Sequence, residues 1–139
     1  TLNKIGSILS PLDYISAMTD VTGFGLLGHL SEMCEGSGLM AEIHYDKVPV
    51  IESLLYYIRQ DCIPGGTNRN WASYGHKISD ITLEQRNVLA DPQISGGLLI
   101  AVEEGSVSQF ESLMKDMDYH VTSFGILKPQ DDDILIKVM

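Results

Sequence analysis

The sequence predicts an α+β domain, layered in the α/β manner, in which a mixed sheet is flanked by helices. Short apolar runs suited to strands alternate with stretches whose apolar residues recur at three- and four-residue steps, as on one face of a helix. Glycine and proline clusters separate these segments. The 139 residues are enough for one ordinary buried core, so we expect a single domain over residues 1–139.

The chain opens with a predicted strand, a helix and a second strand. Residues 16–21 mix apolar and polar positions as a short strand does, and the glycines that follow require a tight turn. A helix is predicted from residue 24, and the stretch EGSG at 35–38 ends it. Residues 39–46, LMAEIHYD, predict a strand that places alternate residues on one face.

The middle of the chain predicts two helices on either side of a long loop. Pro49 opens a helix over residues 50–60, which ends near the turn IPGG. Residues 65–79 mix glycines, asparagines and aromatic residues without a period, so we expect a long ordered loop with a functional role. Thr82 is a capping residue for a short helix that stops before Pro92.

The last third predicts one helix among three strands. The stretch GGLLIAVEEG, residues 96–105, is strongly apolar and predicts a strand, and residues 106–117 carry a helical period. Residues 120–127 and 131–139 predict the two closing strands. The resulting alternation of strands and helices is typical of a layered domain in which helices cover the sheet.

Composition and charge exclude several classes of function. Nineteen acidic and nine basic residues give a net charge of -10, which repels nucleic acid and anionic lipid. No apolar run is long enough to span a membrane. The two cysteines, Cys34 and Cys62, lack the spacing of a zinc site or a disulfide framework, and we expect structural roles for both. These features predict a soluble, cytoplasmic protein with neither nucleic-acid nor membrane partners.

The stretch MTDVTGFGLLGHLSEM contains three glycines in a G-x-G-x-x-G spacing, Gly23, Gly25 and Gly28. This spacing is used by dinucleotide-binding domains, and Asp46 follows about 20 residues later, where a ribose-binding acid would lie. The first strand of such a domain is nearly pure Val, Ile and Leu, because both of its faces are buried. Thr19, Asp20 and Thr22 stand here instead, which argues against dinucleotide binding.

Asp20 and Thr22 place a carboxylate and a hydroxyl at the end of a strand, beside the N-terminus of a helix. Mg²⁺ takes carboxylate oxygens, and helix N-termini and glycine amides accept phosphate oxygens. The pair therefore favours a site for magnesium and phosphate. The alternative is that Asp20 or Thr22 serves only as the N-cap of the helix.

Three segments together resemble the C-terminal domain of selenophosphate synthetases (selenide, water dikinases), within the aminoimidazole ribonucleotide synthetase-like superfamily. They are DVTGFGLLGHLSEM at 20–33, PGGTNRN at 64–70 and ADPQISGGLL at 90–99. The first segment alone is shared with other members of the superfamily. One departure is visible: the family usually has Thr after D-P-Q, and Ile94 lacks that hydroxyl, so no ligand role is expected for it.

The resemblance implies an ATP-dependent enzyme that makes selenophosphate from selenide and ATP and releases AMP and phosphate. It implies Mg²⁺ and ATP as cofactors, with Asp20 as a magnesium ligand and no catalytic residue within this chain. The N-terminal domain, which carries the Cys or selenocysteine nucleophile and the remaining magnesium aspartates, lies outside the chain. A homodimer is implied for the full-length protein, and no turnover is expected from the 139 residues alone. The residues implied at the nucleotide are Thr22, Gly23, Gly25, Thr67, Arg69 and Asn70.

The sequence leaves two alternatives for the polar residues of the loop. Phosphate contact is one role for Thr67, Arg69 and Asn70, and ordering of the loop that carries them is the other. Three functions are compatible with the sequence of the chain as a whole. It is the ATP-facing part of a selenophosphate synthetase, or a non-catalytic assembly module of the same fold, or part of a related ATP-dependent kinase. His29, on the first helix, is expected to be packed or to act as a cap and not to bind a ligand.

Overall fold

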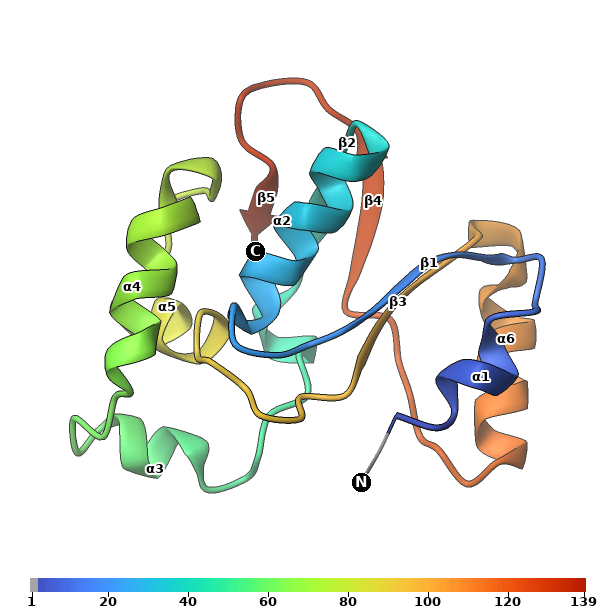
Figure 1. The fold of residues 1–139 in the computed structure, drawn as a ribbon, viewed down its shortest axis with the longest axis horizontal. Coiled ribbons are helices and arrows are strands. Elements are labelled where there is room, and N and C mark those ends of the chain that lie inside the picture. The colour runs from blue at the N-terminus through green and yellow to red at the C-terminus, as the bar shows by residue number, and fades with distance from the viewer. Residues whose placement is uncertain (1–2) are drawn as a thin grey trace.

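The computed structural model describes residues 3–139 and confirms the predicted α+β class, with a mixed sheet and flanking helices (Figure 1). Short helical turns lie between the main elements. In chain order the elements are α1 (Gly6–Leu9), β1 (Ile15–Asp20), α2 (Gly25–Ser37), β2 (Leu39–Ile43), η1 (Tyr45–Lys47), α3 (Leu54–Ile58), α4 (Gly65–Tyr74), η2 (Gly75–Lys77), α5 (Leu83–Leu89), β3 (Leu98–Val102), η3 (Glu104–Ser106), α6 (Val107–Asp116), β4 (Gly125–Pro129) and β5 (Ile136–Val138).

The five strands divide between two sheets. The mixed sheet has the order β4-β2-β5, in which β2 pairs antiparallel with β4 and parallel with β5. Strands β1 and β3 form a separate antiparallel ribbon, with Asp20 opposite Leu98 at one end. Since β1 and β2 lie in different sheets, the segment β1–α2–β2 does not form the parallel strand–helix–strand unit of a dinucleotide-binding domain, in agreement with the sequence argument.

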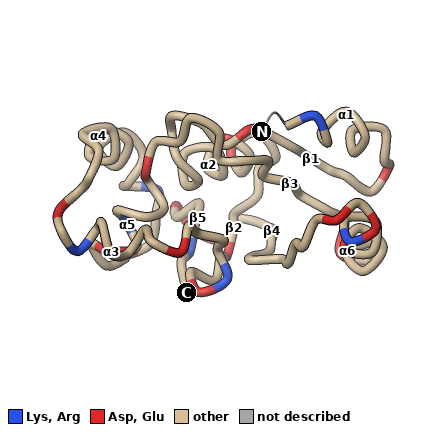
Figure 2. Tube along the Cα trace, turned by 90° about the horizontal axis from the view of Figure 1, so that it is seen from below, with Lys and Arg blue, Asp and Glu red and all other residues tan. Residues whose placement is uncertain are grey.

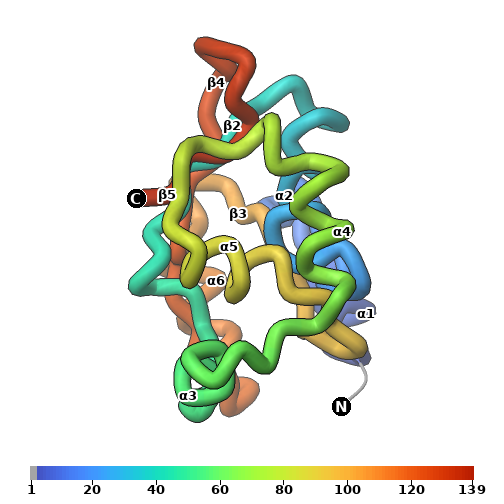
Figure 3. Tube along the Cα trace, turned by 90° about the vertical axis from the view of Figure 1, so that its left-hand side faces the viewer, coloured from blue at the N-terminus to red at the C-terminus, as the bar shows by residue number. Residues whose placement is uncertain are grey.

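Helix α2 lies at the centre of the main core. It packs on β2 and also contacts α4, α5 and the β1–β3 ribbon. The residues of this core that are at most 1% exposed are Leu27, Cys34, Ala41, Ile43, Leu89, Ala90 and Ile136. A smaller core of Leu9, Phe110 and Met114 joins α1 and α6 to the ribbon. In Figure 1 these two helices lie at one end of the molecule, and Figure 3 shows α3, α4 and α5 at the other.

The prediction of a long loop over 65–79 is wrong, because these residues form α4 and the turn η2. The helix turns Thr67, Asn70 and Tyr74 inward, a three- and four-residue spacing typical of a buried helix face. Two of these three residues are polar. The apolar period that reveals most helices was therefore absent from the sequence.

The predicted helix over 50–60 is longer than the one that forms, which covers only Leu54–Ile58. Ile51 is 74% exposed and Tyr56 is 65% exposed, so little apolar burial supports a longer helix. Helix α1 was not predicted. The helix after Thr82 is confirmed, with the Thr82 hydroxyl accepting from the backbone N–H of Gln85 in a capping box.

Charge is dispersed over the molecule. Figure 2 shows lysine and arginine positions spread along the chain among acidic ones, without a basic face in that view. Within residues 3–139, none of the helices has the length and apolar character needed to cross a membrane.

Candidate functional site

Asp20 is the last residue of β1, and its side chain is exposed where the ribbon turns toward α2. The Asn3 side-chain amide donates to Asp20 Oδ1. Neither Asp20 nor Thr22 caps α2, because the N-cap position is Phe24 and no side chain accepts from the first turn. The N-cap alternative is therefore wrong, and the Asp20 carboxylate is not engaged with the helix.

The turn after Asp20 is held by the segment that follows α5. Val21 N–H donates to the carbonyl of Gly97 at 2.9 Å, and Gly96 N–H donates to the carbonyl of Val21 at 3.0 Å. Gln93 N–H donates to the carbonyl of Thr22 at 3.1 Å. These backbone hydrogen bonds fix residues 21–22 against residues 93–97, so the first and third of the three motif segments lie side by side.

Helix α4 brings the second motif segment to the same place. The Asn70 side-chain amide donates to the carbonyls of Gly23 and Ala90, each at 2.9 Å. One turn later on α4, the Tyr74 hydroxyl donates to the carbonyl of Phe24 at 2.7 Å. The three motif segments therefore meet at the start of α2, although they are far apart in the sequence, at 20–33, 64–70 and 90–99.

The two glycines of the turn have different surroundings. Gly25 has φ +70°, and a Cβ added to it would lie 2.8 Å from the carbonyl carbon of Ala90 and 2.9 Å from the carbonyl oxygen of Asp91. A Cβ added to Gly23 would meet nothing within 4 Å. Gly25 is thus required for close packing inside the domain, whereas Gly23 borders open space.

Thr67 is fully buried, and its hydroxyl donates to Asp91 Oδ1 at 3.4 Å. The Gln93 side-chain amide donates to Asp91 Oδ2 at 2.8 Å. Burial raises the pKa of Asp91, and the hydrogen bonds from Thr67 and Gln93 oppose that rise. Arg69, two residues along α4 from Thr67, is exposed.

The predicted site residues therefore fall into two groups. Asp20, Thr22, Gly23 and Arg69 are exposed. Gly25, Thr67 and Asn70 are buried, and their contacts are to other parts of the domain. Sequence reasoning gave no role at the site to Asn3 or Tyr74. No local pattern signals the contact of Asn3 with Asp20, whereas the four-residue helical spacing from Asn70 would have revealed Tyr74.

The donor set at Asp20 fits one side of a magnesium site. Mg²⁺ is held in proteins by one or two carboxylates together with phosphate oxygens and water. Among residues 3–139, no three His, Cys, Asp or Glu side chains gather closely enough to hold a metal ion by themselves. A cation at Asp20 would therefore take its other ligands from nucleotide, water or another part of the protein.

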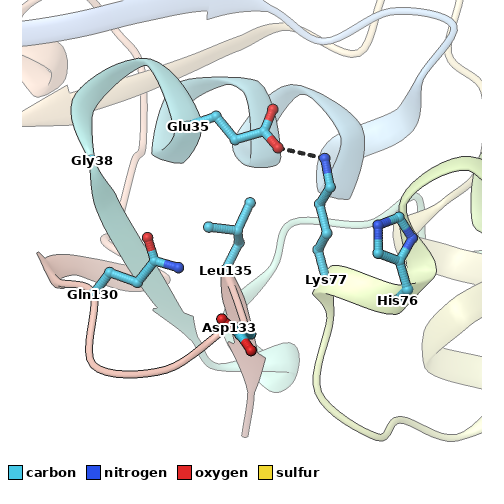
Figure 4. A pocket seen from close by; sticks show the side chains of 7 residues that line it. All are labelled: Glu35, Gly38, His76, Lys77, Gln130, Asp133 and Leu135. Atoms are coloured by element: carbon cyan, nitrogen blue, oxygen red, sulfur yellow. Dashed lines mark hydrogen bonds and ion pairs between the residues drawn. The ribbon is translucent and has the colours of Figure 1, made fainter.

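Two hollows lie along α2. The larger, of about 430 Å³, is at the C-terminal end of the helix, where the Glu35 and Lys77 side chains form an ion pair (Figure 4). The smaller, of about 240 Å³, lies between β1 and α2 and is lined by Met18, His29 and Glu32, among others. The larger hollow contains none of the motif residues.

Residues 3–136 match the family described as "AIR synthase related protein, C-terminal domain", and the chain belongs to this family. Within it the chain is similar to proteins named selenide, water dikinase. It is 51% identical over 138 residues to the protein of Haemophilus influenzae (strain 86-028NP), covering 99% of this chain and 40% of that protein. The relative from Sulfurimonas denitrificans is 46% identical over 135 residues, covering 97% of this chain and 39% of that protein.

A third relative, from Pseudomonas putida, is 50% identical over 127 residues and covers 91% of this chain and 37% of that protein. The resemblance to the C-terminal domain of selenophosphate synthetase is thereby confirmed. The chain spans about 40% of the length of the first of these relatives.

Proposed function

We propose that this domain forms one side of the magnesium–ATP site of a selenophosphate synthetase. The whole protein would make selenophosphate from selenide and ATP, with release of AMP and phosphate. The observation that carries the proposal is the meeting of the three motif segments at the start of α2, with Asp20 exposed beside them. Segments far apart in sequence that converge on an exposed carboxylate are typical of a ligand site carried by a rigid scaffold.

The exposed residues have separate roles in this proposal. Asp20 offers a carboxylate oxygen to Mg²⁺, which screens the charge of the triphosphate. Arg69 carries a planar guanidinium that suits bidentate contact with phosphate oxygens. Gly23 leaves open space in which a nucleotide can approach the backbone. Thr22 presents a hydroxyl two residues after Asp20.

The buried residues support this surface from within. Asn70 holds the Gly23 carbonyl, Thr67 holds Asp91, and Gly25 permits the backbone of residues 90–91 to approach α2. We assign Gly25, Thr67 and Asn70 to shaping the site and not to direct contact with ATP. Their substitution would then lower both stability and nucleotide affinity.

The rest of the site belongs to the full-length protein in this proposal. Its N-terminal domain would supply the nucleophile and the other magnesium ligands, and the protein would act as a homodimer. Phosphoryl transfer depends on many positioned charges at once, so the 139-residue chain alone should show no formation of AMP from ATP and selenide. AMP formation above background by this chain would contradict the assignment.

The decisive test is Asp20→Asn in the full-length protein, because asparagine keeps the shape and removes the charge. We expect selenide-dependent AMP formation to fall by about 100-fold or more, as for the loss of a charge that stabilises a transition state. Glu35→Gln is the matched control, since it removes one carboxylate at the other end of α2. Near-normal activity of Asp20→Asn, with both variants folded, would refute the metal role.

A further inference from the structure

The Thr22 hydroxyl and the imidazole of His29 form a direct contact at the start of α2. Thr22 Oγ1 lies 3.0 Å from His29 Nε2. Thr22 is exposed in the turn, whereas His29 is only 7% exposed and faces inward from the first turns of the helix. A buried ring therefore holds the hydroxyl of a residue that stands at the surface of the proposed ATP site.

The other ring nitrogen of His29 has a charged neighbour. Nδ1 lies 3.2 Å from Glu32 Oε2, one helical turn further along α2. Nδ1 is buried and has no hydrogen bond of regular geometry to any group within residues 3–139. A carboxylate accepts hydrogen bonds and cannot donate them when ionised, so its negative charge, 3.2 Å away, favours a proton on the nearer nitrogen, Nδ1.

A proton on Nδ1 determines the role of Nε2. In the neutral ring, Nε2 then carries a lone pair and accepts a hydrogen bond. The Thr22 hydroxyl must be the donor in that pair, and its single hydrogen is committed to His29. The free lone pairs of Thr22 Oγ1 can then only accept from, or coordinate, an electropositive partner. The packing of the Phe24 ring, 5.8 Å from the imidazole, helps to hold this orientation.

We propose that His29 is a positioning residue that fixes the Thr22 hydroxyl as an acceptor toward the site. The inference rests on the proposed function and refines it. The group that meets Thr22 would be a cation or a water bound to one, because phosphate oxygens at neutral pH are acceptors and would require the hydrogen that His29 holds. Glu32 acts one step further away, through the proton on Nδ1.

The tautomer of His29 is the first test, and it does not depend on activity. The full-length protein would be labelled with ¹⁵N at histidine only, and the His29 signals would be assigned by their loss in His29→Gln. We expect a protonated, pyrrole-type Nδ1 and a lone-pair, pyridine-type Nε2. A proton on Nε2, or on both nitrogens, would overturn the proposal.

Nucleotide binding is the second test. The full-length protein would be titrated calorimetrically with a non-hydrolysable ATP analogue, with and without Mg²⁺. The comparison separates the contribution of the cation to binding from that of the phosphates. We expect His29→Leu and Thr22→Val each to weaken binding with Mg²⁺ by about tenfold, and neither to change binding without Mg²⁺. The double variant should lose no more than Thr22→Val alone, because His29 acts only through the Thr22 hydroxyl.

A conservative variant of His29 distinguishes orientation of the Thr22 hydroxyl from simple packing of the His29 ring. The amide oxygen of His29→Gln reaches from the same backbone position and accepts from Thr22, so binding with Mg²⁺ should recover to within about threefold of the unaltered protein. His120→Leu, a change at an exposed histidine, is the control and should bind normally. Normal Mg²⁺-dependent binding by His29→Leu, or additive losses in the double variant, would overturn the role of His29.

The outcome also separates this inference from the proposed function. If Asp20→Asn weakens Mg²⁺-dependent binding and His29→Leu does not, only the role of His29 is refuted. If neither Asp20→Asn nor Thr22→Val affects that binding, both are refuted. Should His29→Leu fail to fold, the tautomer of the unaltered protein and the binding of His29→Gln still decide the question.

Discussion

The side-chain amide of Asn70 donates one hydrogen bond to the carbonyl of Gly23 and another to the carbonyl of Ala90, both at 2.9 Å. An amide nitrogen carries two hydrogens, so these bonds use its full donor capacity. Asn70 is only 8% exposed, which places the junction largely away from water. A single side chain on α4 thus ties the turn before α2 to the end of α5.

Replacement of Asn70 should destabilise the domain. Asn70→Ala leaves two carbonyls without their donor, and we expect the free energy of unfolding to fall by about 2 kcal/mol. Asn70→Asp should cost more, since it places a carboxylate against two carbonyl oxygens. Urea unfolding of the chain measures both. Arg69→Ala, at the exposed neighbouring position, is the control and should change stability by less than about 0.5 kcal/mol. Equal stability of Asn70→Ala and the unaltered chain would show that the junction does not depend on this amide.

The two glycines of the turn should respond differently to alanine. Gly25→Ala combines a positive φ with a Cβ only 2.8 Å from backbone, and we expect a loss of about 3 kcal/mol or more. Gly23→Ala has open space and should unfold within about 1 kcal/mol of the unaltered chain. Thermal unfolding of the two variants under the same conditions makes the comparison.

A larger side chain at Gly23 tests whether a nucleotide approaches this residue. In the full-length protein, Gly23→Val should weaken ATP binding while leaving the unfolding temperature nearly unchanged. Tight binding by a stable Gly23→Val variant would argue against an approach of the nucleotide at this residue.

Local signals explain what the sequence predicted well. The end of α2 follows from Gly38, whose φ of +68° forms the left-handed cap, and the start of α5 follows from Thr82 and its capping box. Both depend on residues within one helical turn of each other, and such patterns are visible without tertiary structure.

Long-range contacts explain what it missed. The inward face of α4 uses Thr67 and Asn70, which form hydrogen bonds to residues 20 or more positions away, and polar residues at these positions resemble a loop. The contact of Asn3 with Asp20 likewise joins residues 17 apart and follows only from the path of α1 and β1. The division of the strands into two sheets has no local signature at all.

The two cysteines should differ sharply in reactivity. Cys34 is fully buried, and burial, followed by the negative charge of Glu35, raises the pKa of its thiol to about 11. Because the thiolate is the reactive form, Cys34 should resist iodoacetamide at pH 8 in the folded chain. Cys62 is exposed and should be alkylated readily.

Mass spectrometry of the two cysteine-containing peptides, before and after unfolding in urea, measures this difference in alkylation. Rapid labelling of Cys34 in the folded chain would contradict its place in the core.

Asp91 should give the stability of the domain a specific dependence on pH. Its pKa is raised in the folded state by burial, so the folded form holds the proton more tightly than the unfolded chain does. The contribution of this group to stability is therefore fully present below the ordinary aspartate pKa and is lost as the pH rises through the folded-state value. Ionised Asp91 is the costly form, although Thr67 and Gln93 lower that cost.

Asp91→Asn removes the titrating group and should remove this dependence. The amide oxygen can accept from Gln93, and the Thr67 hydroxyl can rotate to accept from the amide nitrogen, so the fold should persist. Measured by urea unfolding between about pH 4 and pH 7, the stability of the variant relative to the unaltered chain should increase as the pH rises. Asp13→Asn makes the same change of charge at an exposed site and serves as the control. If the relative stability of Asp91→Asn stays constant or falls over this range, the ionised Asp91 carboxylate does not destabilise the folded state, and the prediction is wrong.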